Sequence, residues 1–177
     1  MKRRGRTLSL FRFITNIKNK IMSVLSWGKP KIEYGVSTGG AQASSWTEMP
    51  EIVDNTTSLT TEDGEVTEAR EEGGAIVDVK RDKSKFTLTF TIFMKKGDTQ
   101  PIADNDGVII QDYSVRLTPE DEACTGFVLD CCTVSIQKTF SSAEGYRQTY
   151  TFEAKKPASG QMFKEYIKPA GNGGGAG

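Results

Sequence analysis

The residues best suited to chemistry are carboxylates gathered in one stretch, TTEDGEVTEAREEGG, at positions 60–74. The stretch contains six acidic residues and only one basic residue, Arg70; the acids are Glu62, Asp63, Glu65, Glu68, Glu71 and Glu72. Paired carboxylates serve as acid and base in glycosidases, and clustered ones bind calcium. Such sites converge from separate elements, whereas these six follow one another along one run. We therefore predict a polar hairpin, turning at Asp63-Gly64, that is either simply solvated or presents its carboxylates to a water-filled space.

The other residues offer little for catalysis. The chain contains no histidine, which removes the commonest general base and most zinc sites. Three cysteines, without a CxxC spacing, favour a reducing compartment; they are Cys124, Cys131 and Cys132. The run 104–107 (DNDG) is similar to part of a calcium loop, but Ile102 stands where an EF-hand needs its first aspartate, so a turn is expected. The sequence thus predicts no catalytic residue, no cofactor and no metal site, and it argues against an enzyme.

Charge divides the chain unevenly. Seven of the 23 basic residues lie in residues 1–21, which contain no acid, so Met22 onward carries 16 basic against 23 acidic residues. We divide the chain into a basic amphipathic leader (1–21), a β domain (22–169) and a glycine-rich flexible tail (170–177). The leader suits a membrane-surface or nucleic-acid arm, or an extension upstream of a true start at Met22; a secretory signal would need an unbroken apolar core. No apolar run is long enough to span a membrane, and a membrane is not an expected partner.

Two long hairpins are predicted from residues that alternate with a period of two. Between Gly74 and Asp98, apolar residues occupy every second position from Phe86 to Met94, and the polar run 81–84 (RDKS) predicts the turn. The second hairpin spans 127–154 and turns at 141–146. A phase slip at Cys131-Cys132 indicates a β-bulge or a strand covered on both faces. The predicted core consists of Phe86, Leu88, Phe90, Val134, Ile136, Tyr150 and Phe152.

Shorter elements complete the prediction. Strands are expected at 31–36 and 113–117, and the loop between them should be anchored to the sheet by Trp46 and Met49. Thr118 as N-cap, followed by Pro119, predicts a short helix that ends at Gly126. The predicted fold is mostly β: a β-sandwich or barrel of two long-hairpin sheets with one short flanking helix. Its unpaired strand edges favour association with partner subunits.

Five stretches carry a resemblance to a known family: MSVLSWGKPKIEYG, LTTEDGEVTEAREEGG, SKFTLTFTIFMKKG, VRLTPEDEACTGFVLDCCTVSIQKTF and YTFEAKKP. They cover most of the chain from Met22 to Pro169. The sequence resembles the tail tube (major tail) proteins of long-tailed phages, and more closely the tail-tube-like structural proteins of phages and prophages of Bacteroides-type bacteria. The resemblance implies a β-sandwich with a small helix, assembled as hexameric rings that stack into a conduit for DNA. The implied partners are further copies of the chain and other tail proteins, within a virion tail assembled in the host cytoplasm.

Under this resemblance, the six carboxylates at 62–72 are candidates for facing the lumen of the ring. A surplus of acid suits a conduit, because carboxylates repel phosphates and leave DNA free to slide without specific binding. The other class of function is a stand-alone β-sandwich interaction or adhesin-type module. The sequence lacks the Cys–Trp–Cys spacing that is typical of immunoglobulin domains of that class.

Overall fold

The computed structural model describes residues 28–169, so the predicted leader (1–21) and the glycine-rich tail (170–177) lie outside it. Antiparallel strands build the described chain: β1 (Lys31–Val36), β2 (Thr47–Glu48), β3 (Ser58–Glu62), β4 (Val66–Arg70), β5 (Ile76–Arg81), β6 (Lys85–Phe93), β7 (Tyr113–Thr118), β8 (Gly126–Ser141), β9 (Gly145–Ala154) and β10 (Phe163–Tyr166). Residues 28–169 contain no helix, and therefore none that could cross a membrane. The mostly β fold predicted from the sequence is confirmed.

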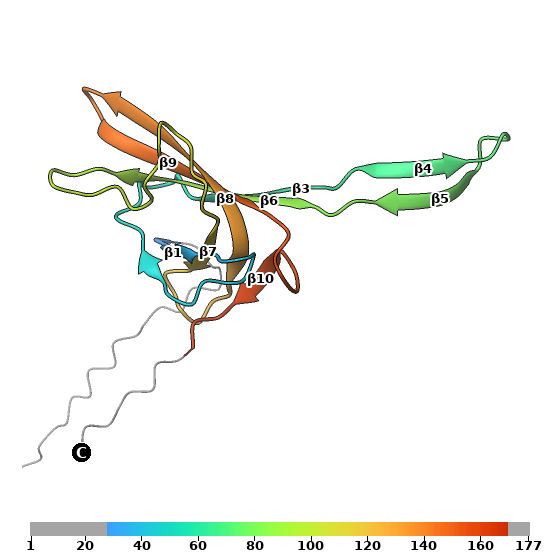
Figure 1. Ribbon diagram of the computed structural model, residues 1–177, viewed down its shortest axis with the longest axis horizontal. Helices are drawn as coiled ribbons and strands as arrows, with labels where there is room; N and C mark the ends of the chain where they lie inside the picture. The colour runs from blue at the N-terminus through green and yellow to red at the C-terminus, as the bar shows by residue number, and fades with distance from the viewer. Residues whose placement is uncertain (1–27, 170–177) are drawn as a thin grey trace, which may run out of the picture.

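Eight strands form one sheet in the order β2-β1-β7-β8-β9-β6-β3, and β10 pairs with β8 beside this path. The sixteen-residue strand β8 connects the two ends of the sheet, because its first half pairs with β7 and β10 and its second half pairs with β9. The sheet curves so strongly that residues from both ends share one core, including Ile32 of β1, Val115 of β7 and Phe90 of β6 (Figure 1). Strands β4 and β5 form a separate two-stranded sheet.

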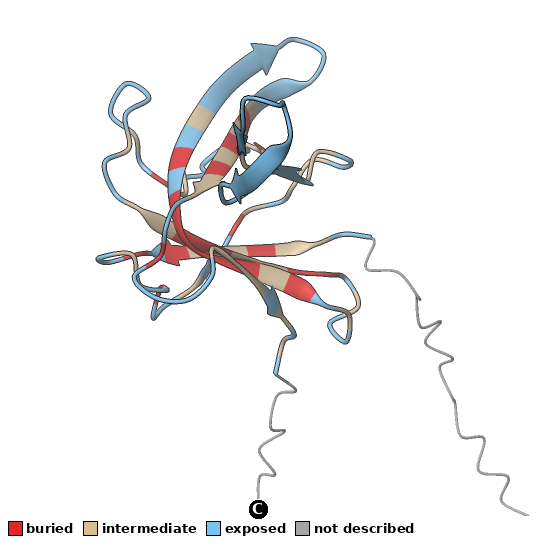
Figure 2. Cartoon of the chain, turned by 90° about the vertical axis from the view of Figure 1, so that its right-hand side faces the viewer, coloured by how far each residue is buried: buried red, intermediate tan, exposed pale blue. Residues whose placement is uncertain are grey.

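The predicted core is confirmed. All seven residues lie in the core or pack against it: Phe86, Leu88, Phe90, Val134, Ile136, Tyr150 and Phe152. The Phe90 ring stacks on the rings of Tyr150 and Phe152, with 5.8 Å between centroids in each pair. Figure 2 shows the buried residues confined to the body of the molecule, while the projecting hairpins are exposed. The alternation of apolar residues in β6 and β9 therefore identified their inward faces correctly.

The phase slip in β8 has both of the predicted causes. Tyr113 pairs with Cys132 whereas Val115 pairs with Leu129, so β8 contains one residue more than β7 across this interval. Every residue of β8 from Val128 to Cys132 is also buried, so both faces are covered. Burial raises the pKa of the Cys131 and Cys132 thiols. These two cysteines therefore remain protonated at neutral pH and are poor nucleophiles.

The predicted hairpin between Gly74 and Asp98 is wrong. Strand β5 pairs with β4, whereas β6 pairs with β3 and β9. The chain runs outward through β3 and β4, turns between Glu71 and Ala75, and returns through β5 and β6 (Figure 1). The two predicted turns, at Asp63-Gly64 and at 81–84, instead lie opposite each other as breaks in these two long arms. Residues that favour turns also interrupt strand pairing, so their signal does not distinguish a reversal from a break.

The predicted flanking helix is also wrong. Thr118 is the last residue of β7, where it pairs with Lys31, and Gly126 is the first residue of β8. Leu117 pairs with Phe127, so the intervening residues must reverse the chain across one strand spacing of about 4.8 Å. They do so through a loop in which the N–H of Cys124 donates to the carbonyl of Asp121 over 2.9 Å.

The predicted anchors in the loop 37–55 are confirmed. Met49 is buried in the core, and the ring of Trp46 lies 4.4 Å from the guanidinium carbon of Arg116. The Nε of Arg116 also donates to the Glu33 carboxylate over 2.6 Å, and this bond lowers the pKa of Glu33. Two contacts thus attach the loop to the sheet. Met49 is buried in the core, and Trp46 packs on the Arg116 guanidinium, which also bonds to Glu33.

A polar network fixes the loop that precedes β7, and the predicted turn at 104–107 lies within it. Oδ1 of Asp104 accepts hydrogen bonds from Gln100 Nε2 (2.6 Å) and Lys138 Nζ (2.7 Å), and Oδ2 accepts one from the N–H of Gly107 (2.7 Å). The network continues into the core, where Gln148 bonds to both Gln100 and Tyr150. The bonds from Gln100, Lys138 and Gly107 lower the pKa of Asp104 from 3.8 to about 2.

Acid should weaken the fold in the range where Asp104 takes up its proton. Because its pKa is lower in the folded protein, this carboxylate stabilises the fold above its ordinary pKa, and that stabilisation is lost as the pH falls from 3.8 towards about 2. Urea unfolding of the wild type and of Asp104→Asn, compared across this range, measures the effect. The free energy of unfolding should fall more steeply with acid in the wild type. Parallel curves for the two proteins would show that Asp104 contributes nothing.

Candidate interaction surface

The hairpin of β4 and β5 projects far from the body of the molecule (Figure 1). Every residue from Glu65 to Lys83 is exposed, and Figure 2 shows this hairpin entirely in the colour of exposed residues. Strands β4 and β5 pair only with each other, so each leaves one backbone edge unpaired among the described residues. An isolated two-stranded ribbon is only marginally stable in water. A projecting, exposed hairpin such as β4–β5 would gain stability by contact with a partner.

The hairpin carries more apolar surface than a solvated arm requires. We call its four large exposed apolar residues the hairpin patch: Val66, Ile76, Val77 and Val79. Val77 is 67% exposed and Val79 is 53% exposed. Val66 pairs with Arg81 and Glu68 pairs with Val79, and cross-strand partners share a face, so this face alternates apolar and charged residues. Large apolar side chains that are exposed together on one projecting element favour contact with another protein.

The arms of the hairpin are continuous with the sheet. Glu62 pairs with Lys85 at the end of the inner pairing, and Val66 pairs with Arg81 at the start of the outer one. Between them, the N–H of Asp82 donates to the carbonyl of Glu65 over 2.9 Å. A Cβ on Gly64 would lie 1.9 Å from the Asp82 carbonyl oxygen, so only glycine allows the arms to approach this closely. The direction of the hairpin is therefore set by β3 and β6.

The six candidate carboxylates lie along the outward arm and at its tip. Glu62 ends β3, Asp63 and Glu65 lie in the break, Glu68 lies in β4, and Glu71 and Glu72 belong to the turn. At about 3.3 Å per residue the run extends over roughly 30 Å, so the carboxylates do not converge on one point. No cluster of acidic, cysteine or histidine residues within 28–169 could hold a metal ion.

Basic residues of the returning arm lie across from the acidic run. Arg81 Nη1 lies 3.9 Å from Asp63 Oδ2, and Lys85 is the cross-strand partner of Glu62. Arg70 also bonds to Glu68 over 2.5 Å on the same strand. These pairs are exposed, so each contributes little stability. The sequence shows only that the run 62–72 is acidic. The structure places basic side chains beside it, because β3 pairs with β6 and β4 pairs with β5.

Sequence reasoning missed the hairpin patch. It placed the strand that carries Val77 and Val79 beside the strand that begins near Phe86, because the polar run 81–84 was interpreted as the turn between them. The available signal was the polarity of the facing arm, where Val66 is the only large apolar residue between Glu62 and Arg70. A strand whose partner is this polar cannot form one wall of a core.

No protein-family model matches the sequence, and no curated protein sequence matches it. One similar solved structure is the sheath/tube terminator of an extracellular contractile injection system (PVC) in the extended state: 13% identity, 71% of this chain, 90% of that chain, TM-score 0.41. Another is the sheath-tube complex of such a system in the extended state: 12% identity, 77% of this chain, 88% of that chain, TM-score 0.44. At identities and TM-scores this low the likeness carries no functional argument, so we infer function from the chain's own surfaces.

Proposed function

We propose that this protein is a structural subunit that assembles with further copies of itself, and that the β4–β5 hairpin lies between neighbouring subunits. The observation that carries the proposal is the hairpin patch, which is apolar, exposed and located on a ribbon whose two outer edges no residue of 28–169 pairs with. A neighbour that covers this patch would bury valine and isoleucine side chains and could extend the ribbon by strand pairing. Both effects favour association over a free subunit.

We further propose that the assembly is of the tail-tube type: six copies form a ring, rings stack into the tube of a phage tail, and DNA passes through the lumen. The eight-stranded sheet supports this proposal, because the outer edges of its end strands β2 and β3 are unpaired within the described part of the chain. A closed ring can pair such edges without creating new ones. Contacts with other tail proteins, assembly in the host cytoplasm and a place in the virion tail belong to the same proposal.

In a ring of this type, we place some of the carboxylates at 62–72 in the lumen. Each carboxylate recurs once per subunit, so modest single charges add up to a negative wall that acts within the Debye length, about 8–10 Å. A wall of this kind repels the phosphates of passing DNA and disfavours binding. Basic residues of the returning arm reduce the surplus of acid but lie on the opposite strand.

Reversing three of these charges should make assembled tubes retain DNA. We choose Glu65, Glu71 and Glu72, which are exposed, and replace each with lysine. Subunit stability should stay within about 0.5 kcal/mol per site, because the side chains are solvated. Retention should fall steeply as salt rises, since released counterions drive phosphate binding. Co-sedimentation of tubes with DNA at several salt concentrations measures it.

The matched control is Glu165→Lys, which adds a positive charge on β10, away from the hairpin. It should leave DNA retention at the wild-type level. If the triple variant retains no more DNA than this control, the carboxylates face outward and the lumen proposal fails. Altered stacking of rings in the triple variant, with unchanged retention, would place the same residues between rings.

A further inference from the structure

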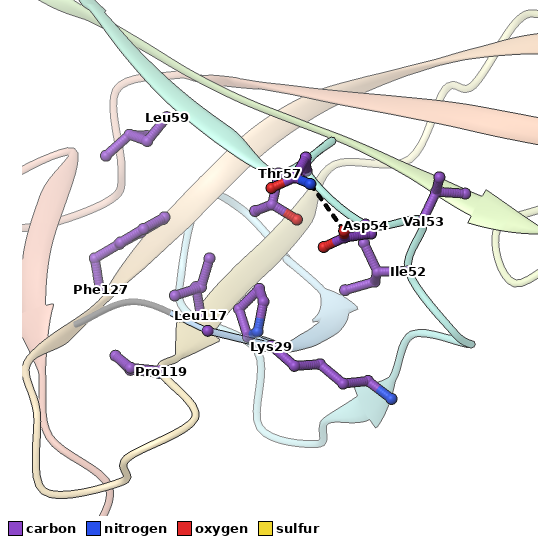
Figure 3. A pocket seen from close by; sticks show the side chains of 12 residues that line it. Lys29, Ile52, Val53, Asp54, Thr57, Leu59, Leu117, Pro119 and Phe127 are labelled. Carbon is purple, nitrogen blue, oxygen red and sulfur yellow. Dashed lines mark hydrogen bonds between the residues drawn. The ribbon is translucent and has the colours of Figure 1, made fainter. Parts of the chain in front are cut away.

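A groove of about 750 Å³ opens where the curved sheet fails to close on itself. Its walls come from strands that are not neighbours in the sheet: Leu59 of the end strand β3 on one side, and Leu117 of β7 and Phe127 of β8 on the other. Pro30, Ile52, Val53 and Pro119 add apolar surface, as Figure 3 shows for most of these residues. The volume exceeds the share of a single water, about 30 Å³, many times over, so the groove has room for several side chains.

No described residue covers this groove, and Leu59 on its wall is 36% exposed. Strand β3 is the last strand of the sheet, so its outer backbone edge is also unpaired among residues 28–169. An apolar groove beside an open strand edge favours a short apolar segment as its occupant.

The chain itself enters the structure at this groove, because Gly28 is one of the residues that line it. The backbone there is fixed: Gly28 has a φ of +99°, and the N–H of Lys29 donates to Glu120 Oε2 over 3.1 Å. The positive φ of Gly28 is a conformation that favours glycine, whereas the Glu120 carboxylate ends a flexible side chain and could move aside for a Cβ. Trp27 is therefore only one peptide bond away from the groove wall.

The sequence immediately before Gly28 suits the groove. Residues 22–27 read MSVLSW, with Val24, Leu25 and Trp27 as large apolar side chains. The segment upstream of it is basic, whereas Asp54 and Glu120 lie on or beside the groove. The apolar side chains of residues 24–27 and the basic charge upstream of them thus both match the groove.

We propose that residues 24–27 of the same chain fill this groove, with the Trp27 indole packed between Leu59 and Phe127. A tryptophan buries up to about 250 Å², so this contact would close the open seam of the sheet. The contact is intramolecular and does not depend on the proposed assembly. It makes the residues just before β1 part of the folded domain.

Fluorescence of the full chain tests this proposal, because the chain contains only two tryptophans, Trp27 and Trp46. In a Trp46→Phe variant, Trp27 is the only tryptophan. Its emission should be shifted to shorter wavelength than in the urea-unfolded chain, and acrylamide should quench it several-fold less efficiently. Leu59→Asp on the groove wall should move the emission back towards that of the unfolded chain. Thr57→Glu, from the facing segment, gives a second variant with the same expected shift if Leu59→Asp weakens the fold.

The matched control is Ile110→Asp, because Ile110 is 95% exposed and does not line the groove. It should leave the Trp27 emission unchanged. Trp27 emission equal to that of the unfolded chain would overturn the proposal. So would a blue-shifted emission that neither groove variant moves, since Trp27 would then be buried elsewhere. A shift that disappears on dilution would assign the groove to a second copy and would also overturn the intramolecular contact.

Discussion

Replacing Val77 and Val79 together with aspartate should abolish assembly and leave the subunit folded. Both side chains are mostly exposed in the single chain, so their loss should change subunit stability by no more than about 0.5 kcal/mol per site. In an interface, each buried valine contributes about 1.5 kcal/mol or more, and an unpaired carboxylate there adds a further cost. The two changes should weaken each contact by at least about 3 kcal/mol, or roughly 100-fold. Light scattering reports assembly, and circular dichroism reports folding.

The matched control for this experiment is the pair Val108→Asp and Ile110→Asp. These residues are 61% and 95% exposed on a loop outside the hairpin, so the control introduces the same charges on equally apolar surface. We expect the control to assemble like the wild type. If the hairpin variant still assembles, or if both double variants lose assembly equally, the hairpin patch is not the specific contact.

Leu88→Ala should cost about 2–5 kcal/mol of unfolding free energy, the range for truncating a buried leucine. Leu88 is 0% exposed and lies in the middle of β6, with β3 on one side and β9 on the other. The surrounding rings, which stack closely, leave little scope for the site to collapse. Urea unfolding should be measured at a concentration where the protein is monomeric. Ile110→Ala is the control and should stay within about 0.5 kcal/mol; equal losses for both variants would contradict the assignment of the core.

The inward faces of the main strands could be predicted because they depend on a local period. In β6 and β9, apolar residues at every second position can reach only one side of the sheet, whichever strand lies next to them. The same period assigned β8 as a strand with a slip at its cysteines, and Met49 was predicted to be an anchor as a large apolar residue in a loop. These features need no knowledge of long-range pairing.

Pairing itself could not be read from the same pattern. Asp63-Gly64 and residues 81–84 both have turn chemistry, yet in the structure they are breaks that face each other, while the reversal occurs at 71–75. Similarly, Thr118 and Pro119 carry the signal for a helix start, but β1 pairs with Thr118 and keeps it extended. In both cases a contact distant in sequence decided the outcome.

The candidate surface was predictable only in part. The acidic run was visible as a polar hairpin from its composition, and its carboxylates lie on an exposed hairpin. The hairpin patch was not visible, because exposed valines on a projecting arm have the same spacing as buried ones on a sheet. Only the pairing of β5 with β4, instead of β6, separates them from the core.

Electron microscopy of the purified full-length protein, with light scattering over a wide concentration range, tests most directly whether this chain assembles through its hairpin. We expect rings or stacked rings in which β4 and β5 lie between neighbouring subunits and the hairpin patch is covered. A monomer at every concentration would contradict it. So would rings in which the hairpin projects freely into solvent.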